Sequence, residues 1–143
     1  MTASLILGVG NPDRGDDGAG IHAARLLRGQ QRVKEVRDCS TLLDLWEDET
    51  DVTVIDAMYS GAEPGTISRY DGMRDPLPLR GFSSTHSFGL AESVELGRVL
   101  GRLPRRLTIY GIEGSSFGHG EALSPRVQEA VETLAAKLVK GAG

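Results

Sequence analysis

Four acidic residues stand where the sequence predicts that buried strands end. Asp17 follows an apolar run at residues 4–9, and Asp38, Asp56 and Glu113 end three further strand-like runs. Because the carboxyl ends of parallel strands meet at one edge of a sheet, we expect these carboxylates to gather there. Clustered carboxylates repel one another unless a cation, a proton or a basic partner compensates them. The pattern therefore favours a cation-binding or acid–base site at this edge.

Among the three histidines, His86 is the best candidate for a nitrogen ligand in this cluster. It precedes a segment of helical periodicity, and the amino end of a helix disfavours a protonated imidazole. A neutral histidine is the form that binds a metal ion. A local role, in which His86 caps the helix or forms a nearby hydrogen bond, is the alternative. We expect His22 and His119 to have solvated surface roles.

The glycine-rich stretch at residues 8–20 matches a dinucleotide-binding fingerprint only in part. Gly8 and Gly10 fit the first two glycines, but Asp13 takes the place of the third. The acidic residues nearby would also repel a pyrophosphate, and the chain has no P-loop pattern. The pair Asp16–Asp17 instead indicates a cation site, or carboxylates that cap the amino end of a helix.

The segments that position these residues alternate between strand and helix. Strand patterns cover residues 4–9, 33–38, 51–57, 66–71 and 107–113, and the fourth is weaker, as is typical of an antiparallel edge. Helical patterns begin near residue 16, at Ser40, at His86 and at Ser124. The alternation predicts an α/β sandwich with a mostly parallel sheet.

Two further features concern the second half of the chain. The helical pattern at residues 86–101 has its apolar stripe at Leu96, Val99, Leu100 and Leu103. Residues 72–85 contain Pro76 and Pro78 and show no periodicity, which is typical of a functional loop. We expect this loop to border the acidic cleft and to be mobile.

The composition excludes several classes of protein. The chain has 143 residues, of which 39% are hydrophobic and 25% charged, and this fits one globular domain over residues 1–143. A net charge of −4 argues against nucleic acid or an anionic membrane as a partner, and no apolar run could span a bilayer. Cys39 is the only cysteine, which excludes an intramolecular disulfide and a cysteine-rich zinc module. The N-terminus has no signal-peptide pattern, so we expect a cytoplasmic protein.

Four stretches of the chain resemble the hydrogenase maturation proteases. The first reads GVGNPDRGDDGAG at residues 8–20, and the second reads VIDA at residues 54–57, followed by Gly61 and by Pro64–Gly65. The third reads STHSFGLAE at residues 84–92, and the fourth reads YGIEG at residues 110–114, with LSP at residues 123–125. The order and spacing are those of the family, and the resemblance extends over residues 5–139.

This resemblance implies an endopeptidase that removes the C-terminal extension of a [NiFe]-hydrogenase large-subunit precursor after nickel has been inserted. It also implies a twisted five-stranded sheet between helices, and a metal-contacting, catalytic trio that falls on Asp17, Asp56 and His86. Asp38 is expected to contact the substrate. The chain departs from its relatives in two places: Asp17 stands where some have glutamate, and Cys39–Ser40 stands where glycines are common.

We expect nickel to be the metal, brought by the precursor and held weakly or not at all by the resting protein. Two carboxylates and one imidazole leave coordination positions open and lack the thiolates that hold such ions tightly. The ion can activate a water or polarise the scissile carbonyl. Alternatively, it only orients the cleavage site while a carboxylate acts as general base, as in an aspartyl-type peptidase.

The sequence does not favour a serine or a cysteine nucleophile. No serine lies in a nucleophile elbow, and the carboxylate beside Cys39 raises the pKa of its thiol. A nickel-recognition module that assists hydrogenase assembly without cutting is one alternative function. A nucleotide-binding enzyme is the other.

Overall fold

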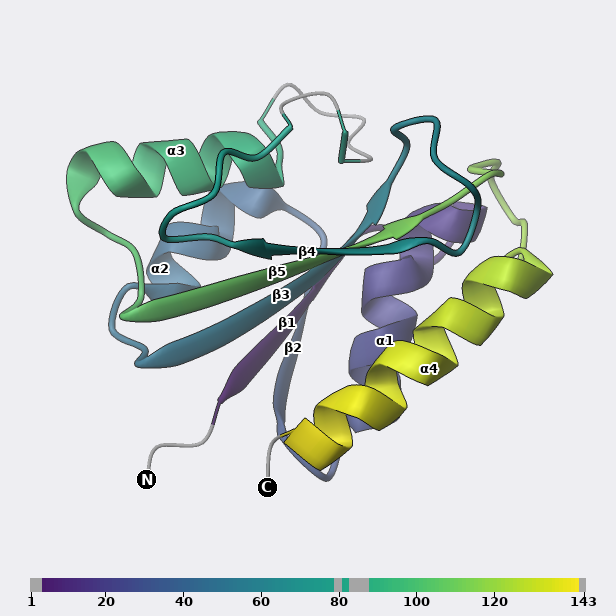
Figure 1. Cartoon of the computed structure of the whole chain (residues 1–143), viewed down its shortest axis with the longest axis horizontal. Coiled ribbons are helices and arrows are strands. Elements are labelled where there is room, and N and C mark those ends of the chain that lie inside the picture. The colour runs from purple at the N-terminus through teal and green to yellow at the C-terminus, as the bar shows by residue number, and fades with distance from the viewer. Residues whose placement is uncertain (1–3, 79–80, 83–87, 142–143) are drawn as a thin grey trace.

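Strands from five parts of the chain form one sheet in the computed structural model, which describes residues 4–78, 81–82 and 88–141 (Figure 1). They are β1 (Leu5–Val9), β2 (Arg32–Val36), β3 (Asp51–Met58), β4 (Ile67–Asp71) and β5 (Arg106–Glu113). Their order across the sheet is β2-β1-β3-β5-β4, and each neighbouring pair is parallel except β4 and β5. The prediction of a mostly parallel sheet with an antiparallel edge strand is confirmed.

Helices cover both faces of the sheet, which gives a three-layer α/β architecture (Figure 1). On one face lie α1 (Ala19–Leu27) and α4 (Pro125–Gly141), and on the other lie α2 (Leu42–Trp46) and α3 (Leu90–Leu100). Two 3₁₀ turns, η1 (Gly15–Gly18) and η2 (Cys39–Thr41), lead into α1 and α2. No helix within the described ranges is long and apolar enough to cross a membrane.

The side chains of β3 alternate between two hydrophobic cores. Val54 and Met58 are buried in the core beneath α2 and α3, whereas Ile55 and Ala57 are buried in the core beneath α1 and α4. Successive side chains of a strand point to opposite faces of the sheet, so Asp56 faces the α2–α3 side. The strand is buried on both faces, which explains its continuous apolar sequence.

Glycines in the N-terminal stretch allow α1 to lie directly against the sheet. A Cβ atom on Gly20 would lie 2.1 Å from the carbonyl oxygen of Ile55 and 2.6 Å from that of Val9. A Cβ on Gly8 would lie 2.5 Å from the carbonyl oxygen of Gly20. These contacts are too close for any side chain, so the glycines serve helix–sheet packing. The packing holds η1, with its acidic pair, at the carboxyl ends of β1 and β3.

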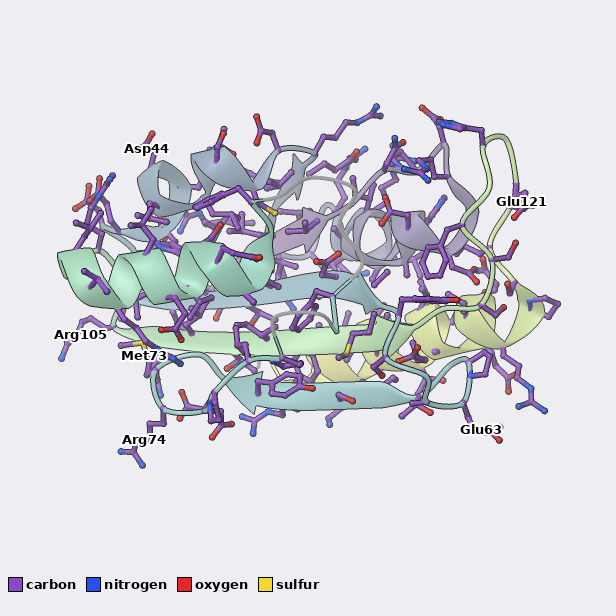
Figure 2. The ribbon with its side chains drawn as sticks, turned by 90° about the horizontal axis from the view of Figure 1, so that it is seen from above. Asp44, Glu63, Met73, Arg74, Arg105 and Glu121 are labelled. Atoms are coloured by element: carbon purple, nitrogen blue, oxygen red, sulfur yellow. The ribbon has the colours of Figure 1, made fainter. Side chains whose placement is uncertain are left out.

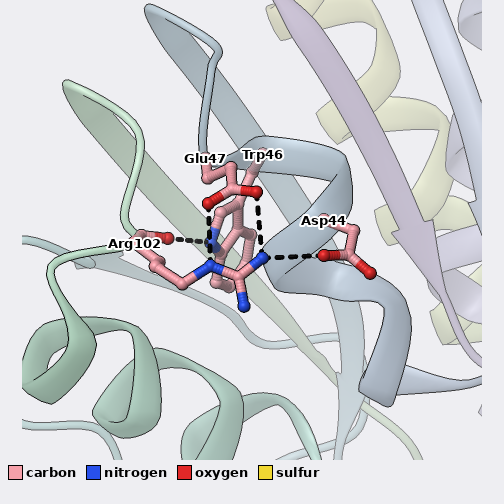
Figure 3. Close-up of polar contacts among 4 residues, drawn as sticks. All are labelled: Asp44, Trp46, Glu47 and Arg102. Carbon is pink, nitrogen blue, oxygen red and sulfur yellow. Dashed lines mark hydrogen bonds and ion pairs between the residues drawn. The ribbon is translucent and has the colours of Figure 1, made fainter.

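A polar cluster at the opposite end of the sheet ties α2 to the connection between α3 and β5 (Figure 3). The indole of the fully buried Trp46 donates to the carbonyl oxygen of Arg102 at 2.9 Å. The Arg102 guanidinium in turn bonds the carboxylates of Glu47 and Asp44 at 2.7 Å each. This cluster therefore ties the carboxyl end of α2 to the segment that follows α3.

The apolar stripe expected on α3 does not face the core, except at Leu103, which follows the helix and packs against the core. Leu96, Val99 and Leu100 are 39%, 80% and 53% exposed, whereas Leu90, Ala91, Val94 and Gly97 are buried. The reason is that α3 packs through its small residues. A Cβ on Gly97 would lie 2.6 Å from the Leu103 side chain, so that leucine folds back into the space that the glycine leaves.

The 3₁₀ turn before α2 is capped by Asp38, whose carboxylate accepts from the Ser40 N–H at 2.9 Å, and not by Ser40 itself. In the expected loop at residues 72–85, the described residues contain no helix and no strand, and Phe82 forms a bridge to Met58. Residues 79–80 and 83–85 lie outside the described part of the chain, and the mobility of the loop stays a prediction.

Candidate active site

Asp56 and Asp17 come together at the carboxyl end of the central strands. Asp56, the third residue from the end of β3, is 2% exposed, and its carboxylate accepts from the Ala57 N–H at 2.8 Å. Burial, together with the negative charge of Asp17, raises the pKa of the Asp56 carboxyl well above its usual value. The two side chains therefore interact, as the sequence predicted for acids that follow neighbouring parallel strands.

The loop before α1 closes tightly around Asp17. The N–H of Asn11 donates to the Asp17 carboxylate at 3.1 Å and approaches its carbonyl oxygen at 3.3 Å. Gly10 has a φ of 142°, and a Cβ there would lie 2.0 Å from the carbonyl oxygen of Asp17. Only glycine fits this position, so the glycine of the turn is needed to hold Asp17 at the end of β1.

Cys39 and two more acids form the side of the site next to α2 and α3. Burial raises the pKa of the Cys39 thiol to about 12, with further contributions from the charges of Asp56, Asp38 and Glu92. The expectation of a raised thiol pKa is thus confirmed, although burial and not the adjacent carboxylate is the largest cause. Asp38 is exposed at this side, and its contact with a substrate stays a prediction.

Glu113 lies at the same edge of the sheet but does not need a cation there. Its buried carboxylate accepts from the N–H and the hydroxyl of Ser60, at 2.8 and 2.6 Å, and from the N–H of Gly61 at 3.3 Å. Glu113 thus lies at the expected edge, but hydrogen bonds rather than a cation compensate its charge. Its hydrogen bonds to the turn after β3 satisfy the negative charge within the fold.

Asp16 has a structural role that sequence reasoning missed. Its fully buried carboxylate accepts hydrogen bonds from Ser115 and Ser116, and from both the N–H and the hydroxyl of Ser124 at 2.7 Å. Burial alone would raise the pKa of Asp16, but these hydrogen bonds outweigh it and lower the pKa. Asp16 thus ties η1 to the loop before α4. The partners are about a hundred residues away, and no local pattern could have revealed them.

The third expected ligand, His86, lies outside the described residues. The structure therefore brings together Asp17 and Asp56, and the complete trio stays a prediction. Within the described ranges, no group of three or more histidines, cysteines and acids is arranged to hold a metal ion. Figure 2 shows Glu121 of the loop before α4 at the end of the molecule where β5 ends, and Asp44 and Arg105 at the other end.

Two known proteins with similar sequences have names that refer to hydrogenase formation or maturation. A hydrogenase expression/formation protein HupD from Thiocapsa roseopersicina is 29% identical over 148 residues, covering 92% of this chain and 67% of its own length. The hydrogenase 2 maturation protease of Escherichia coli K12 is 27% identical over 136 residues, covering 90% of this chain and 83% of its own length.

Solved structures with this fold carry similar descriptions. The [NiFe] hydrogenase maturation protease HybD from Thermococcus kodakarensis is 26% identical, with a TM-score of 0.76 over 99% of this chain and 100% of its own. The hydrogenase maturating endopeptidase HybD from Escherichia coli is 22% identical, with a TM-score of 0.77 over 98% of this chain and 91% of its own. This likeness shows a shared fold. The family model described as hydrogenase maturation protease matches residues 38–141. The chain belongs to the hydrogenase maturation protease family.

Proposed function

We propose that this protein is an endopeptidase that removes the C-terminal extension of a [NiFe]-hydrogenase large-subunit precursor once nickel has been inserted. Membership of the family supports the peptidase activity on a hydrogenase precursor. The observation that carries the rest is the buried pair of Asp17 and Asp56 at the carboxyl end of the sheet.

The acid pair fits a positive ion brought by the substrate. Burial is the larger cause of the raised pKa of Asp56, and repulsion by Asp17 adds to it. A cation beside the two carboxylates relieves that repulsion but leaves the effect of burial in place. His86, at the start of the segment that leads into α3, supplies the nitrogen ligand in this proposal. The nickel ion of the precursor contributes positive charge that polarises the scissile carbonyl.

The remaining chemistry falls to the carboxylates. Burial raises the pKa of the Asp56 carboxyl, and in this proposal that carboxyl acts as the general base and then as the general acid. Asp56 takes a proton from the water that attacks the carbonyl carbon and passes it to the leaving amide nitrogen. The C–N bond then breaks, which leaves a new carboxyl terminus on the large subunit and a free amine on the released peptide.

The test is cleavage of the nickel-loaded precursor, followed by mass spectrometry of the large subunit. The wild-type protein and the Asp48→Asn control, altered at an exposed position, should release the peptide. Asp56→Asn and His86→Gln should not, while their far-UV circular dichroism stays that of the wild type. Binding of the loaded precursor without any released peptide would instead favour the nickel-recognition module.

A further inference from the structure

An aromatic pair lies at the end of the sheet that carries the acids. Tyr59 directly follows β3 and is 66% exposed. Its ring meets that of Phe117, from the loop before α4, edge to face at 89° with 5.3 Å between centroids. Phe117 is partly buried against the core beneath α1 and α4. A large exposed ring beside a candidate active site is the kind of surface that binds a partner.

The two buried carboxylates outside the proposed chemistry hold this pair in place. Glu113 accepts hydrogen bonds from Ser60 and Gly61, which directly follow Tyr59. The N–H of Tyr59 itself donates to the carbonyl oxygen of Gly81 at 2.7 Å. The backbone that carries this exposed ring is therefore fixed.

Asp16 likewise fixes the backbone that carries Phe117, the second ring of the pair. It accepts from the N–H groups of Ser115 and Ser116, which directly precede Phe117. A Cβ on Gly114 would lie 2.7 Å from both the Asp16 Cβ and the Phe117 ring, so the glycine lets the ring lie close to Asp16. Buried hydrogen-bonded carboxylates rigidify the groups around them, and here they rigidify an exposed surface.

The pair is within reach of a peptide that is bound at the acids. Tyr59 follows Asp56 by three residues, which corresponds to about 10 Å of extended chain. Asp56 faces the α2–α3 side of the sheet, and Phe117 packs on the α1–α4 side. A peptide that crosses the carboxyl end of β3 in an extended form passes from the acids to the rings within a few residues.

We propose that Tyr59 and Phe117 form a subsite for an apolar side chain of the precursor's C-terminal segment, a few residues from the bond that is cut. This inference rests on the proposed function. The rings present apolar surface on a rigid frame, so the side chain they receive is aliphatic or aromatic. Tyr59 is then a substrate-binding residue that sets affinity, and it takes no part in the proton transfer.

The test is steady-state cleavage of the nickel-loaded precursor by Tyr59→Ala, Tyr59→Phe and wild type. Val99→Ala serves as the control, because Val99 is 80% exposed on α3 away from the acids. We expect Tyr59→Ala to raise KM about tenfold, the effect of losing an aromatic anchor, with kcat within about twofold. Tyr59→Phe keeps the ring and should restore KM, and the control should match the wild type.

The outcomes separate this inference from the function on which it rests. Cleavage by the wild type with an unchanged KM for Tyr59→Ala overturns the subsite and leaves the peptidase in place. A loss of kcat with unchanged KM also overturns it, because that result belongs to a group that acts in the chemical step. If the wild type does not cleave the loaded precursor, both the proposed function and the subsite are wrong.

Discussion

Asp17 acts on Asp56 across the end of the central strand and helps to keep the pKa of that buried carboxyl raised. The two residues are brought together by different elements, Asp56 by β3 and Asp17 by the turn η1 in front of α1. Folding thus brings two carboxylates into a buried position where their charges repel each other. This costs free energy unless a proton or a cation is present. Such an arrangement is typical of a functional site.

Removing the charge of Asp56 should stabilise the resting protein as the pH rises. The pKa of Asp56 is raised in the folded state, so its contribution to stability is complete below the unfolded-state pKa and is lost as the pH rises through the folded-state pKa. Asp56→Asn removes this loss. Urea unfolding should show that the difference in unfolding free energy between variant and wild type shifts in favour of the variant from pH 5 to pH 8. A difference that is constant over this range would contradict the burial argument.

The same substitution should abolish activity. General acid–base catalysis contributes about 10²- to 10⁴-fold to a rate, and we expect Asp56→Asn to lower kcat for the loaded precursor by at least that range. Single-turnover cleavage measures the effect without interference from product release. A variant that retains a tenth of the wild-type rate would exclude Asp56 from the proton transfer.

Asp16→Asn should destabilise the fold with the opposite pH dependence. The amide cannot accept all the hydrogen bonds that Ser115, Ser116 and Ser124 donate, and we expect a loss of about 2–3 kcal/mol at pH 7. The pKa of Asp16 is lowered in the folded state, so this stability is present above the unfolded-state pKa and is lost as the pH falls through the folded-state pKa. The difference in unfolding free energy between Asp16→Asn and the wild type, measured by urea unfolding, should therefore become smaller as the pH falls. The Asp48→Asn control should unfold like the wild type at both pH values.

Cys39 should be dispensable for cleavage. A thiol with a pKa of about 12 is almost entirely protonated at pH 8, and the thiolate is the reactive form. Native protein should react with iodoacetamide much more slowly than urea-unfolded protein does, and Cys39→Ala should cleave the loaded precursor within about threefold of the wild-type rate. Complete loss of cleavage in a folded Cys39→Ala variant would contradict this prediction and indicate that the thiol acts as the nucleophile.

The parts of this fold that could be predicted from sequence follow short-range patterns. The run at residues 51–57 alternates its side chains between two cores, and β-branched residues mark it as a central strand. From parallel strands alone, Asp17 and Asp56 could be expected to meet. Asp16 and Glu113 could not be assigned, because one binds serines about a hundred residues away and the other binds the turn that follows a different strand.

Local sequence patterns also could not predict which face of α3 is buried. Leu96, Val99 and Leu100 form an apolar stripe, yet the helix turns its smaller residues inward. The fit to the segment that follows the helix decides which face of α3 is buried, because Leu103 fills the space beside Gly97. Packing of this kind depends on the volumes of side chains from several elements, and periodicity in one element does not report them.

Cleavage of nickel-loaded beside nickel-free precursor, with metal analysis of the purified protein, shows whether the ion arrives with the substrate. The resting protein should hold much less than one nickel per chain and release a C-terminal peptide only from the loaded precursor. The precursor's ion would then complete a site that Asp17, Asp56 and His86 leave open. Stoichiometric nickel in the resting protein, together with equal cleavage of loaded and empty precursor, would contradict it.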